Sequence, residues 1–252
     1  LMTSLSSRFK HQMAHEWRYR CLHNKKELGF RYDAPFSGIY APALLKKLSD
    51  RCLQQQAIVT CDVGQHQMWL AQELGDMVPG SHLTSGGLGA MGYALPAGLG
   101  AAIGRPERPV WVVIGDGGFQ MTLQELATIV QEDVPLRIAV IDNGYLGMVR
   151  QWQHLFYKDT FYATEYSGNP DFVKIAEAYG IMGIRVTDKT QVTAAIQDAM
   201  AHDGPVIVDF VVDPEENVYP FIPPGESIKE LIEAPEELGA TPQIKPGVLP
   251  PS

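Results

Sequence analysis

Four short runs of aliphatic and β-branched residues recur along the chain, separated by longer segments with helical periodicity. They are residues 57–63 (AIVTCDV), 110–114 (VWVVI), 136–141 (LRIAVI) and 206–212 (VIVDFVV). Apolar runs with little alternation are typical of strands that are buried on both faces, as in a parallel sheet covered by helices. The sequence therefore predicts an α/β fold in which a parallel β-sheet is flanked by helices.

The segments between these runs predict the covering helices. The stripe from Val192 to Met200 follows the i, i+3, i+4, i+7, i+8 spacing of a helix with one apolar face. A second helix is predicted from Phe172 to Tyr179, and we expect Asn169 to act as its N-terminal cap. A third is expected over residues 120–131, between the second and third strands. These stripes indicate surfaces that face the core.

The charged side chains are predominantly acidic. Lys and Arg number 20 against 29 Asp and Glu, and the resulting net charge of −9 disfavours nucleic acid or an anionic membrane as a partner. No apolar run approaches the roughly 18 residues of a membrane span, so no membrane association is expected. The cysteines Cys21, Cys52 and Cys61 fit no metal-binding spacing. We expect them to be buried or incidental thiols of a cytoplasmic protein.

The patterns divide the chain into three parts. Residues 41–214 carry the strand and helix patterns and are predicted to form the α/β domain. Residues 1–40 are polar and irregular and are interpreted as a linker that trails a preceding domain. Residues 215–252 are rich in proline and acidic residues, with one short helical pattern at 227–233. This last part is expected to be a tail that wraps around the domain or frays.

A first polar break follows the strand predicted at 57–63. Gly64 allows the backbone to approach a ligand closely, and the start of the next helix offers unpaired N–H groups to an anion. His66 in this helix is a candidate donor to such an anion. A helix-capping turn with a structural histidine explains the segment equally well, so both interpretations stay open.

A second break contains a formal G-x-G-x-x-G pattern at Gly87, Gly89 and Gly92, and Asp116 lies 24 residues further on. A dinucleotide-binding fingerprint needs a buried strand directly before the glycines. The preceding segment, 79–85, is short and polar and makes a poor buried strand. A dinucleotide-binding oxidoreductase is therefore kept only as a remote alternative.

A third break places oxygen ligands at the ends of two neighbouring strands. Asp116 lies between glycines after the strand at 110–114, and Asn143 follows the strand at 136–141. One β-α-β crossover joins them, so both strand ends lie on the same edge of the sheet. A carboxylate and an amide oxygen beside exposed backbone N–H groups suit Mg²⁺ that also binds phosphate. Two ordinary capped turns are the alternative, but they would not explain the flanking glycines.

These residues carry a resemblance to a known family. A GDG sequence at 115–117 followed, after residues 118–142, by Asn143 resembles the signature of thiamine-diphosphate enzymes; Asp142 stands where the family usually has asparagine. Narrower motifs resemble the catalytic subunits of acetolactate synthases. They are VGQHQMW (63–69), SGGLGAMGYALPA (85–97), GDGGFQMTLQELATIV (115–130) and GMVRQWQHLFY (147–157). The resemblance identifies residues 41–214 as the domain that binds thiamine diphosphate and Mg²⁺.

The resemblance implies a cofactor site. The metal would be held by Asp116, Asn143 and the backbone carbonyl of Tyr145. Gly89 and Met91 would contact the aminopyrimidine ring, with Met91 wedged between the two rings of the cofactor. The residues implied to surround the diphosphate are Val63, Gly64, Gln65, His66, Gly117 and Gly118. FAD is implied for the full-length enzyme, with residues 1–40 as the trailing end of its central domain.

The resemblance also implies a reaction. Pyruvate would lose CO₂ and condense with a second 2-keto acid, pyruvate or 2-ketobutyrate, in branched-chain amino acid biosynthesis. Met148, Val149 and Trp152 match the acceptor pocket, with Trp152 favouring 2-ketobutyrate; core packing is the alternative for Met148 and Trp152. Another thiamine-diphosphate decarboxylase or oxidase, or the cofactor-binding subunit of a split enzyme, is the alternative function.

The implied assembly is larger than this chain. A homodimer or tetramer of the full-length transferase is expected, with a small regulatory subunit as a further candidate partner. In the family, the glutamate that activates the cofactor comes from an N-terminal domain of a neighbouring subunit, and no counterpart of that segment is found here. The isolated chain is therefore expected to bind thiamine diphosphate and Mg²⁺ weakly and to make no acetolactate.

Overall fold

The structure is a computed structural model that describes residues 11–27, 29–30, 32, 38–75 and 77–234. The chain divides into two compact units. One comprises Phe36–Val218, and the other comprises Leu1–Pro35 with Tyr219–Ser252. The ends of the predicted linker and tail, residues 1–10 and 235–252, lie outside the described residues. Among the helices that are described, none has the length and apolar character needed to cross a bilayer.

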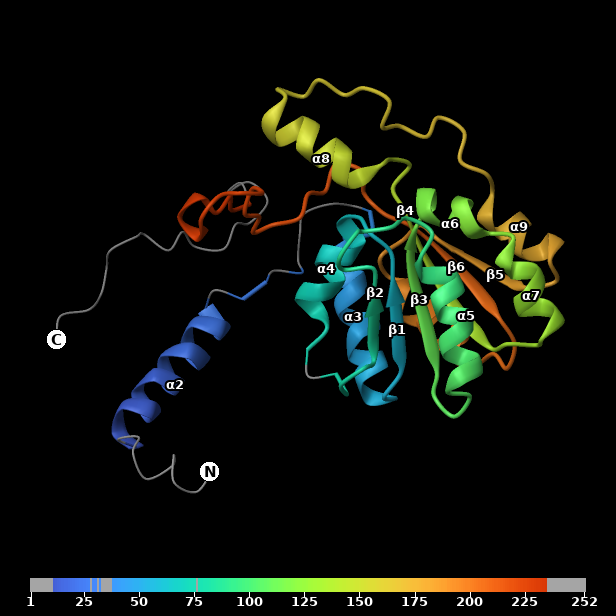
Figure 1. The fold of residues 1–252 in the computed structure, drawn as a ribbon, viewed down its shortest axis with the longest axis horizontal. Helices are drawn as coiled ribbons and strands as arrows, with labels where there is room; N and C mark the ends of the chain where they lie inside the picture. Colours follow the sequence, from blue (N-terminus) through green and yellow to red (C-terminus); the bar gives the residue numbers. More distant parts are fainter. Residues whose placement is uncertain (1–10, 28, 31, 33–37, 76, 235–252) are drawn as a thin grey trace. The chain divides into compact units, whose positions relative to one another are not determined.

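The unit Phe36–Val218 is built on one six-stranded sheet in which every paired strand is parallel, with the order β2-β1-β3-β4-β6-β5 (Figure 1). The strands are β1 (Ile58–Cys61), β2 (His82–Thr84), β3 (Val110–Gly115), β4 (Leu136–Asp142), β5 (Met182–Val186) and β6 (Val206–Val211). All four strands predicted from the apolar runs are present, so the predicted fold class is confirmed.

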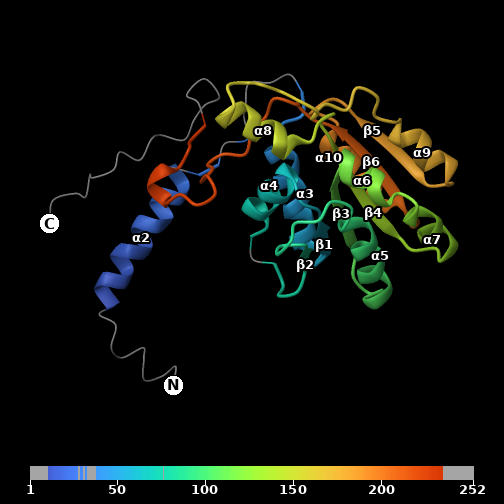
Figure 2. The same cartoon turned by 45° about the horizontal axis from the view of Figure 1, so that its top comes forward.

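Helices cover both faces of the sheet (Figures 1 and 2). One face packs against α3 (Ala41–Gln54), α4 (Gln65–Glu73) and α10 (Val192–Ala201). The other packs against α5 (Ala94–Gly104), α6 (Asp116–Thr122), α7 (Glu125–Gln131) and α9 (Phe172–Ala178). The helix α8 (Gly147–Phe156) belongs to neither layer and lies beyond the carboxyl edge of the sheet.

The central strands explain why the runs show little alternation. In β3, Val110, Val112 and Ile114 pack into the apolar cluster with α5, α7 and α9. Trp111 and Val113, which point to the opposite face, pack into the cluster with α3, α4 and α10. All of these side chains are buried. Because each face of the sheet has its own apolar layer, both faces of a central strand need hydrophobic residues.

Neither edge strand was predicted from the sequence. The segment 79–85, judged a poor strand because it is polar, contains β2, which pairs with β1 from Val59 opposite His82 to Cys61 opposite Thr84. At the other edge, β5 was not predicted at all. Their side chains are largely half-buried or exposed, so backbone pairing rather than apolar burial forms these strands. A prediction based on apolar runs does not detect them.

The predicted helix over 120–131 is wrong in detail, because two shorter helices, α6 and α7, occupy the region. Between them the backbone tightens to i to i−3 hydrogen bonds, from Leu126 N to Leu123 O (3.0 Å) and from Ala127 N to Gln124 O (3.1 Å). The first of the two helices begins at Asp116, so Gly117 and Gly118 lie in its first turn.

The predicted cap of α9 is also wrong. Asp171, not Asn169, caps the helix, and its side chain accepts hydrogen bonds from Val173 N (3.1 Å) and Lys174 N (3.2 Å). The stripe from Val192 to Met200 is confirmed as part of α10.

The second unit departs from its predicted irregularity. Residues 11–27 form the helix α2 (His11–Glu27), whose described side chains, at 15–26, are all exposed. A polar helix without an apolar stripe gives no periodic signal, which is why the pattern missed it. In the tail, the helical pattern at 227–233 corresponds to a short 3₁₀ helix, Ile228–Glu230.

Candidate functional site

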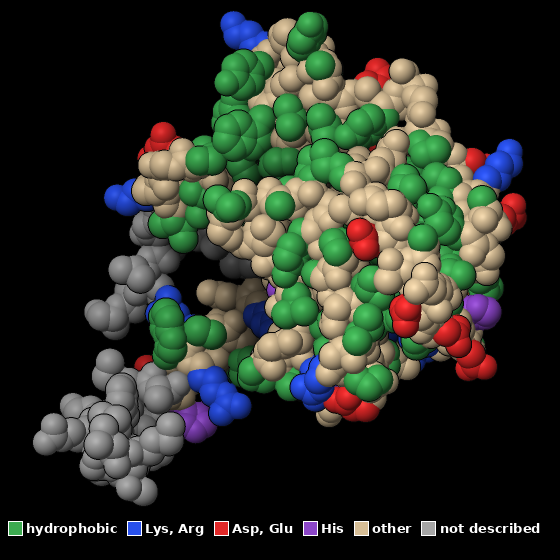
Figure 3. Space-filling view, turned by 45° about the vertical axis from the view of Figure 1, so that its right-hand side comes forward, with side chains coloured by type: hydrophobic (Ala, Val, Ile, Leu, Met, Phe, Trp, Pro, Cys, Tyr) green, Lys and Arg blue, Asp and Glu red, His purple; other side chains and the backbone are tan. Residues whose placement is uncertain are grey.

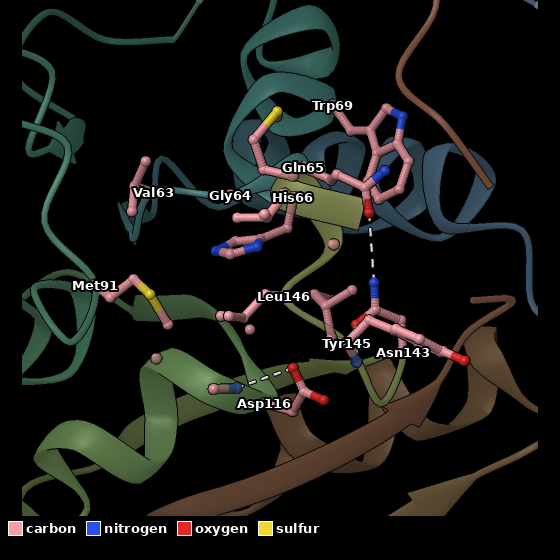
Figure 4. Close-up of a pocket in the computed structure, with 17 residues that line it drawn as sticks. Val63, Gly64, Gln65, His66, Trp69, Met91, Asp116, Asn143, Tyr145 and Leu146 are labelled. Carbon is pink, nitrogen blue, oxygen red and sulfur yellow. Dashed lines mark hydrogen bonds between the residues drawn. The ribbon is translucent and has the colours of Figure 1, made fainter. Parts of the chain in front are cut away.

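The site lies where the strand order reverses. From β1 the chain moves outward to β2, whereas from β3 it moves to β4 on the other side. The crevice outside the carboxyl ends of two such strands is where open α/β sheets bind ligands. A pocket with an empty volume of about 720 Å³, including the solvent at its mouth, opens at this point (Figure 4).

Most of the residues singled out from the sequence line this one pocket. They are Val63, Gly64, Gln65, His66, Met91, Asp116, Gly117, Gly118, Asn143, Tyr145, Met148 and Val149. Gly89 and Trp152 are not among the lining residues. The lining comes from the segments after β1, β3 and β4 and from the loop before α5, so residues about 85 positions apart meet in one cavity.

Asp116 is the buried acid of the pocket, with 2% of its surface exposed. Its Oδ2 accepts hydrogen bonds from Gly144 N (3.0 Å) and from Asn169 Nδ2 (2.7 Å), and its Oδ1 accepts one from Gly117 N (2.9 Å). Burial raises the pKa of Asp116 to about 7; the hydrogen bond from Asn169 opposes the rise, and the charge of Asp142 adds to it. A carboxylate in this setting gains from a cation that compensates its charge.

Asn143 presents its amide on the neighbouring strand end. Its Nδ2 donates to Gln65 Oε1 (3.4 Å), and its Oδ1 accepts from Tyr145 N (3.0 Å), which leaves a second lone pair on that oxygen. Gly144, between these residues, has a φ of +69°, a conformation that favours glycine.

The oxygens of Asp116 and Asn143 therefore fit a hard cation such as Mg²⁺. Within the described residues there is no cluster of three or more His, Cys, Asp or Glu that could hold a metal. A magnesium site built from one acid, one amide and one backbone carbonyl does not require such a cluster.

Glycines line the pocket on both sides and leave no space for side chains. A Cβ on Gly117 would collide with the hydroxyl of Tyr166, and a Cβ on Gly118 with the carboxylate of Asp62. Gly64, with a φ of +148°, is the N-cap of α4, so the first N–H groups of that helix are directed at the pocket. Unpaired N–H groups at the start of a helix can bind an anion.

His66 lies across the pocket from Asp116 (Figure 4). The ring is buried, and its Nε2 has no hydrogen-bond partner among the described residues. Burial lowers the pKa of His66 to about 4, so the imidazole is neutral at pH 7. A neutral imidazole retains one N–H donor. The geometry thus places this histidine inside the pocket, whereas the sequence left open a purely structural role.

The loop that carries Met91 is fixed by Asp62, which sequence reasoning passed over. The Asp62 carboxylate accepts hydrogen bonds from Gly92 N (2.7 Å) and Ala94 N (2.5 Å). Met91 projects toward the pocket from this loop (Figure 4). The glycine-rich segment joins β2, whose side chains are only half-buried, to α5, which begins at Ala94. The dinucleotide interpretation therefore lacks the buried strand that it needs.

The helix α8 carries the predicted acceptor residues. Met148 and Val149 line the pocket, whereas Trp152 is 37% exposed and packs edge-on against Phe156, with 5.9 Å between the ring centroids. The alternative interpretation of Trp152 as a core residue is therefore wrong. In Figure 3, hydrophobic side chains gather on the surface at the end of the unit where α8 lies. The buried residue of this helix is instead Gln151.

Asn169 is the site residue that sequence reasoning placed wrongly. Its side chain does not cap α9 but reaches the carboxylates of Asp116 and Asp142. The one available signal was the proline at 170, since a residue before proline favours an extended backbone and leaves its side chain free to turn away from the helix.

Comparisons with known proteins agree with this geometry. Residues 62–210 match the family model described as "Thiamine pyrophosphate enzyme, C-terminal TPP binding domain". The chain is 46% identical over 219 residues to the acetolactate synthase isozyme 2 large subunit of Escherichia coli, covering 87% of this chain and 40% of that protein. It is 44% identical over 205 residues to the acetolactate synthase large subunit of Corynebacterium glutamicum, covering 79% of this chain and 33% of that one. The chain thus spans well under half of the length of these relatives.

Proposed function

Because this chain belongs to the thiamine pyrophosphate enzymes, whose C-terminal TPP-binding domain it matches, we propose that it is part of an acetolactate synthase large subunit. In this proposal it supplies the half of the active site that binds the diphosphate and the metal. The observation that carries the proposal is that Asp116 and Asn143 meet in the pocket at the switch point of the sheet.

Different residues of the pocket would bind the metal and the diphosphate. Asp116, Asn143 and the carbonyl of Tyr145 would hold Mg²⁺, which neutralises the diphosphate. The N–H groups at the start of α4 and in the first turn of α6 would surround the phosphate oxygens. The lining residues that would take part are Val63, Gly64, Gln65, His66, Gly117 and Gly118.

The chemistry would come from the cofactor and its orientation from the protein. When bound, thiamine diphosphate supplies an electron sink for the loss of CO₂ from a 2-keto acid. Met91, held by the loop that Asp62 fixes, would support the bent conformation of the cofactor, and the backbone of Gly89 would contact its aminopyrimidine. Residues that hold the cofactor in one orientation would accelerate the reaction by keeping the reacting groups close together.

The acceptor would bind beneath α8. Met148 and Val149 face the pocket, and Trp152 stands one turn further along the same helix. We propose pyruvate as the donor and pyruvate or 2-ketobutyrate as the acceptor, with the products feeding branched-chain amino acid biosynthesis. The relatives are named large subunits, which supports a small regulatory subunit as a partner. A homodimer or tetramer and FAD in the full-length enzyme belong to the same proposal.

Cofactor binding tests this proposal first. Trp69 lines the pocket, so intrinsic fluorescence reports on its occupancy. Thiamine diphosphate should quench the fluorescence of the purified chain in the presence of Mg²⁺ and much less in EDTA, while NADH should have no effect. Absence of any Mg²⁺-dependent change at millimolar cofactor would overturn the proposal.

A product assay separates acetolactate synthesis from other thiamine-diphosphate reactions. The chain alone should make no acetolactate from pyruvate, because the activating glutamate that the resemblance implies lies outside it. A protein extended to the full length of the relatives should make acetolactate. Acetaldehyde or acetyl phosphate as the main product would indicate a decarboxylase or an oxidase instead.

A further inference from the structure

We propose that Asn169 is a positioning residue for the metal site: it bridges two carboxylates and thereby determines which oxygen of Asp116 faces the metal. This inference rests on the proposed function, since it assigns a role toward the metal of that site. It concerns a residue that is not a candidate ligand itself and lies 53 positions from Asp116 in the chain.

Two carboxylate oxygens share the same two donors. Asn169 Nδ2 donates to Asp116 Oδ2 (2.7 Å) and to Asp142 Oδ1 (3.0 Å). The backbone N–H of Gly144 lies near the same two oxygens, at 3.0 Å and 3.2 Å. Asp116 directly follows β3 and Asp142 ends the neighbouring strand β4, so two unscreened negative charges would repel each other there. The shared donors hold these oxygens together despite that repulsion.

The sharing leaves one oxygen of Asp116 for a ligand. Its Oδ2 already accepts two hydrogen bonds, whereas its Oδ1 accepts only the N–H of Gly117 among the described residues. A carboxylate oxygen has two lone pairs, so Oδ1 keeps one available. Asn169 thereby selects Oδ1 of Asp116 as the oxygen that binds the cation in the pocket.

Gln120 determines the orientation of the Asn169 amide. Gln120 Nε2 donates to the main-chain carbonyl of Asp116 (3.2 Å) and to Asn169 Oδ1 (3.0 Å). A carbonyl can only accept, so the nitrogen of Gln120 must face it. The oxygen of Asn169 then faces this nitrogen, and its NH₂ group is left to face the two carboxylates. A chain of amides thus directs both donor hydrogens at the acids.

The backbone holds Asn169 in place from both sides. On one side, Leu146 N donates to Thr164 O (2.7 Å) and Tyr166 N donates to Gly144 O (2.8 Å), which pairs this segment with the loop after β4. On the other side, Asp171 caps α9. Because Asn169 lies between two anchored points, its side chain is preorganised for the carboxylates.

Magnesium affinity in the presence of saturating thiamine diphosphate tests the proposal. Partners that orient metal ligands typically change metal affinity by 10- to 100-fold, so we expect Asn169→Ala to weaken Mg²⁺ binding by about that factor. In an Asp142→Asn background the loss should be several-fold smaller, because the second charge is gone. Asp188→Ala is the control: it removes the hydrogen bonds of an exposed turn outside this segment and should lower the melting temperature without changing the Mg²⁺ affinity.

A second measurement on the metal-free protein separates this inference from the proposed function. In urea unfolding, Asn169→Ala should destabilise the chain more when residue 142 is Asp than in the Asp142→Asn background. If the parent chain shows no Mg²⁺-dependent cofactor binding, the proposed function fails, and the unfolding data still decide whether Asn169 bridges the two acids. Unchanged Mg²⁺ affinity in Asn169→Ala, an equal loss in Asp188→Ala, or additive unfolding effects would each overturn the positioning role.

Discussion

Gln65 of α4 and Gln151 of α8 are joined by a buried hydrogen bond from Nε2 to Oε1 of 2.9 Å. Gln151 is fully buried, and its Oε1 also accepts the backbone N–H of Val218 (2.8 Å). Gln65 in turn donates to the carbonyl of Glu216 (2.9 Å) and accepts from Asn143. One amide pair therefore connects α4 and α8 with the loop after β4 that carries Asn143.

Removing this connection should destabilise the domain. Gln151→Leu keeps the volume but leaves the N–H of Val218 and one N–H of the Gln65 amide unpaired in the interior, at an expected cost of about 1–3 kcal/mol in the free energy of unfolding. His154→Ala on the same helix removes only an exposed pair with Asp159 and should change this free energy by less than about 0.5 kcal/mol. Urea unfolding measures both, and equal effects would contradict the proposed anchoring of α8.

Substitution of Asp116 should affect cofactor binding and the stability of the metal-free protein differently. Loss of a metal ligand should weaken Mg²⁺-dependent cofactor binding by more than about 100-fold in Asp116→Asn, since orienting partners alone contribute up to that factor. Burial raises the pKa of Asp116 to about 7 in the metal-free protein, which means that the ionised group costs stability. In the metal-free protein, the stability of Asp116→Asn relative to the parent chain should therefore increase between pH 5 and pH 8. Retained cofactor affinity would argue against the assigned role.

Glu216 should make stability depend on pH. Its side chain is 5% exposed, its Oε2 has no partner among the described residues, and burial raises its pKa to about 7, with Asp213 adding to the rise. A carboxyl with a raised pKa in the folded state binds protons more tightly there than in the unfolded chain. Its contribution is therefore most favourable below about pH 4.5 and is lost as the pH rises through 7.

Glu216→Gln should accordingly stabilise the chain by about 3 kcal/mol at pH 8 and by less than about 1 kcal/mol at pH 5. Denaturant unfolding at the two pH values measures the difference. Glu215→Gln, at the exposed neighbouring position, is the control and should leave the pH dependence unchanged. A stabilisation that is the same at both pH values would exclude titration of Glu216 as its origin.

The cysteines should differ in reactivity. Cys21 is exposed, whereas Cys52 and Cys61 are buried. Burial raises the pKa of Cys52 to about 12 and that of Cys61 well above its usual value. Since the thiolate is the reactive form, Ellman's reagent at pH 8 should modify Cys21 quickly and the other two only after denaturation. Fast reaction of more than one thiol in the native chain would contradict the packing described.

Local pattern determined much of the fold. The runs at 110–114 and 136–141 are apolar because both faces of a central strand are covered, and this requirement is visible along the chain. The same regularity placed Asp116 and Asn143 together, since a crossover of fixed hand brings consecutive strand ends to one edge. The edge strands β2 and β5 were not predicted, because hydrogen bonds to the backbone of the adjacent strand, rather than apolar burial, hold them in place.

The side chains that orient the site were decided by tertiary structure alone. Asn169 looked like a helix cap, Gln151 like one polar residue among others on α8, and Asp62 like the end of a strand. Each acts through a hydrogen bond to a group at least 30 positions away. Sequence by itself determined which segments become strands and where candidate ligands emerge, because those depend on local periodicity. Which polar groups meet depends on the directions of side chains from separate elements, and only the packed fold sets them.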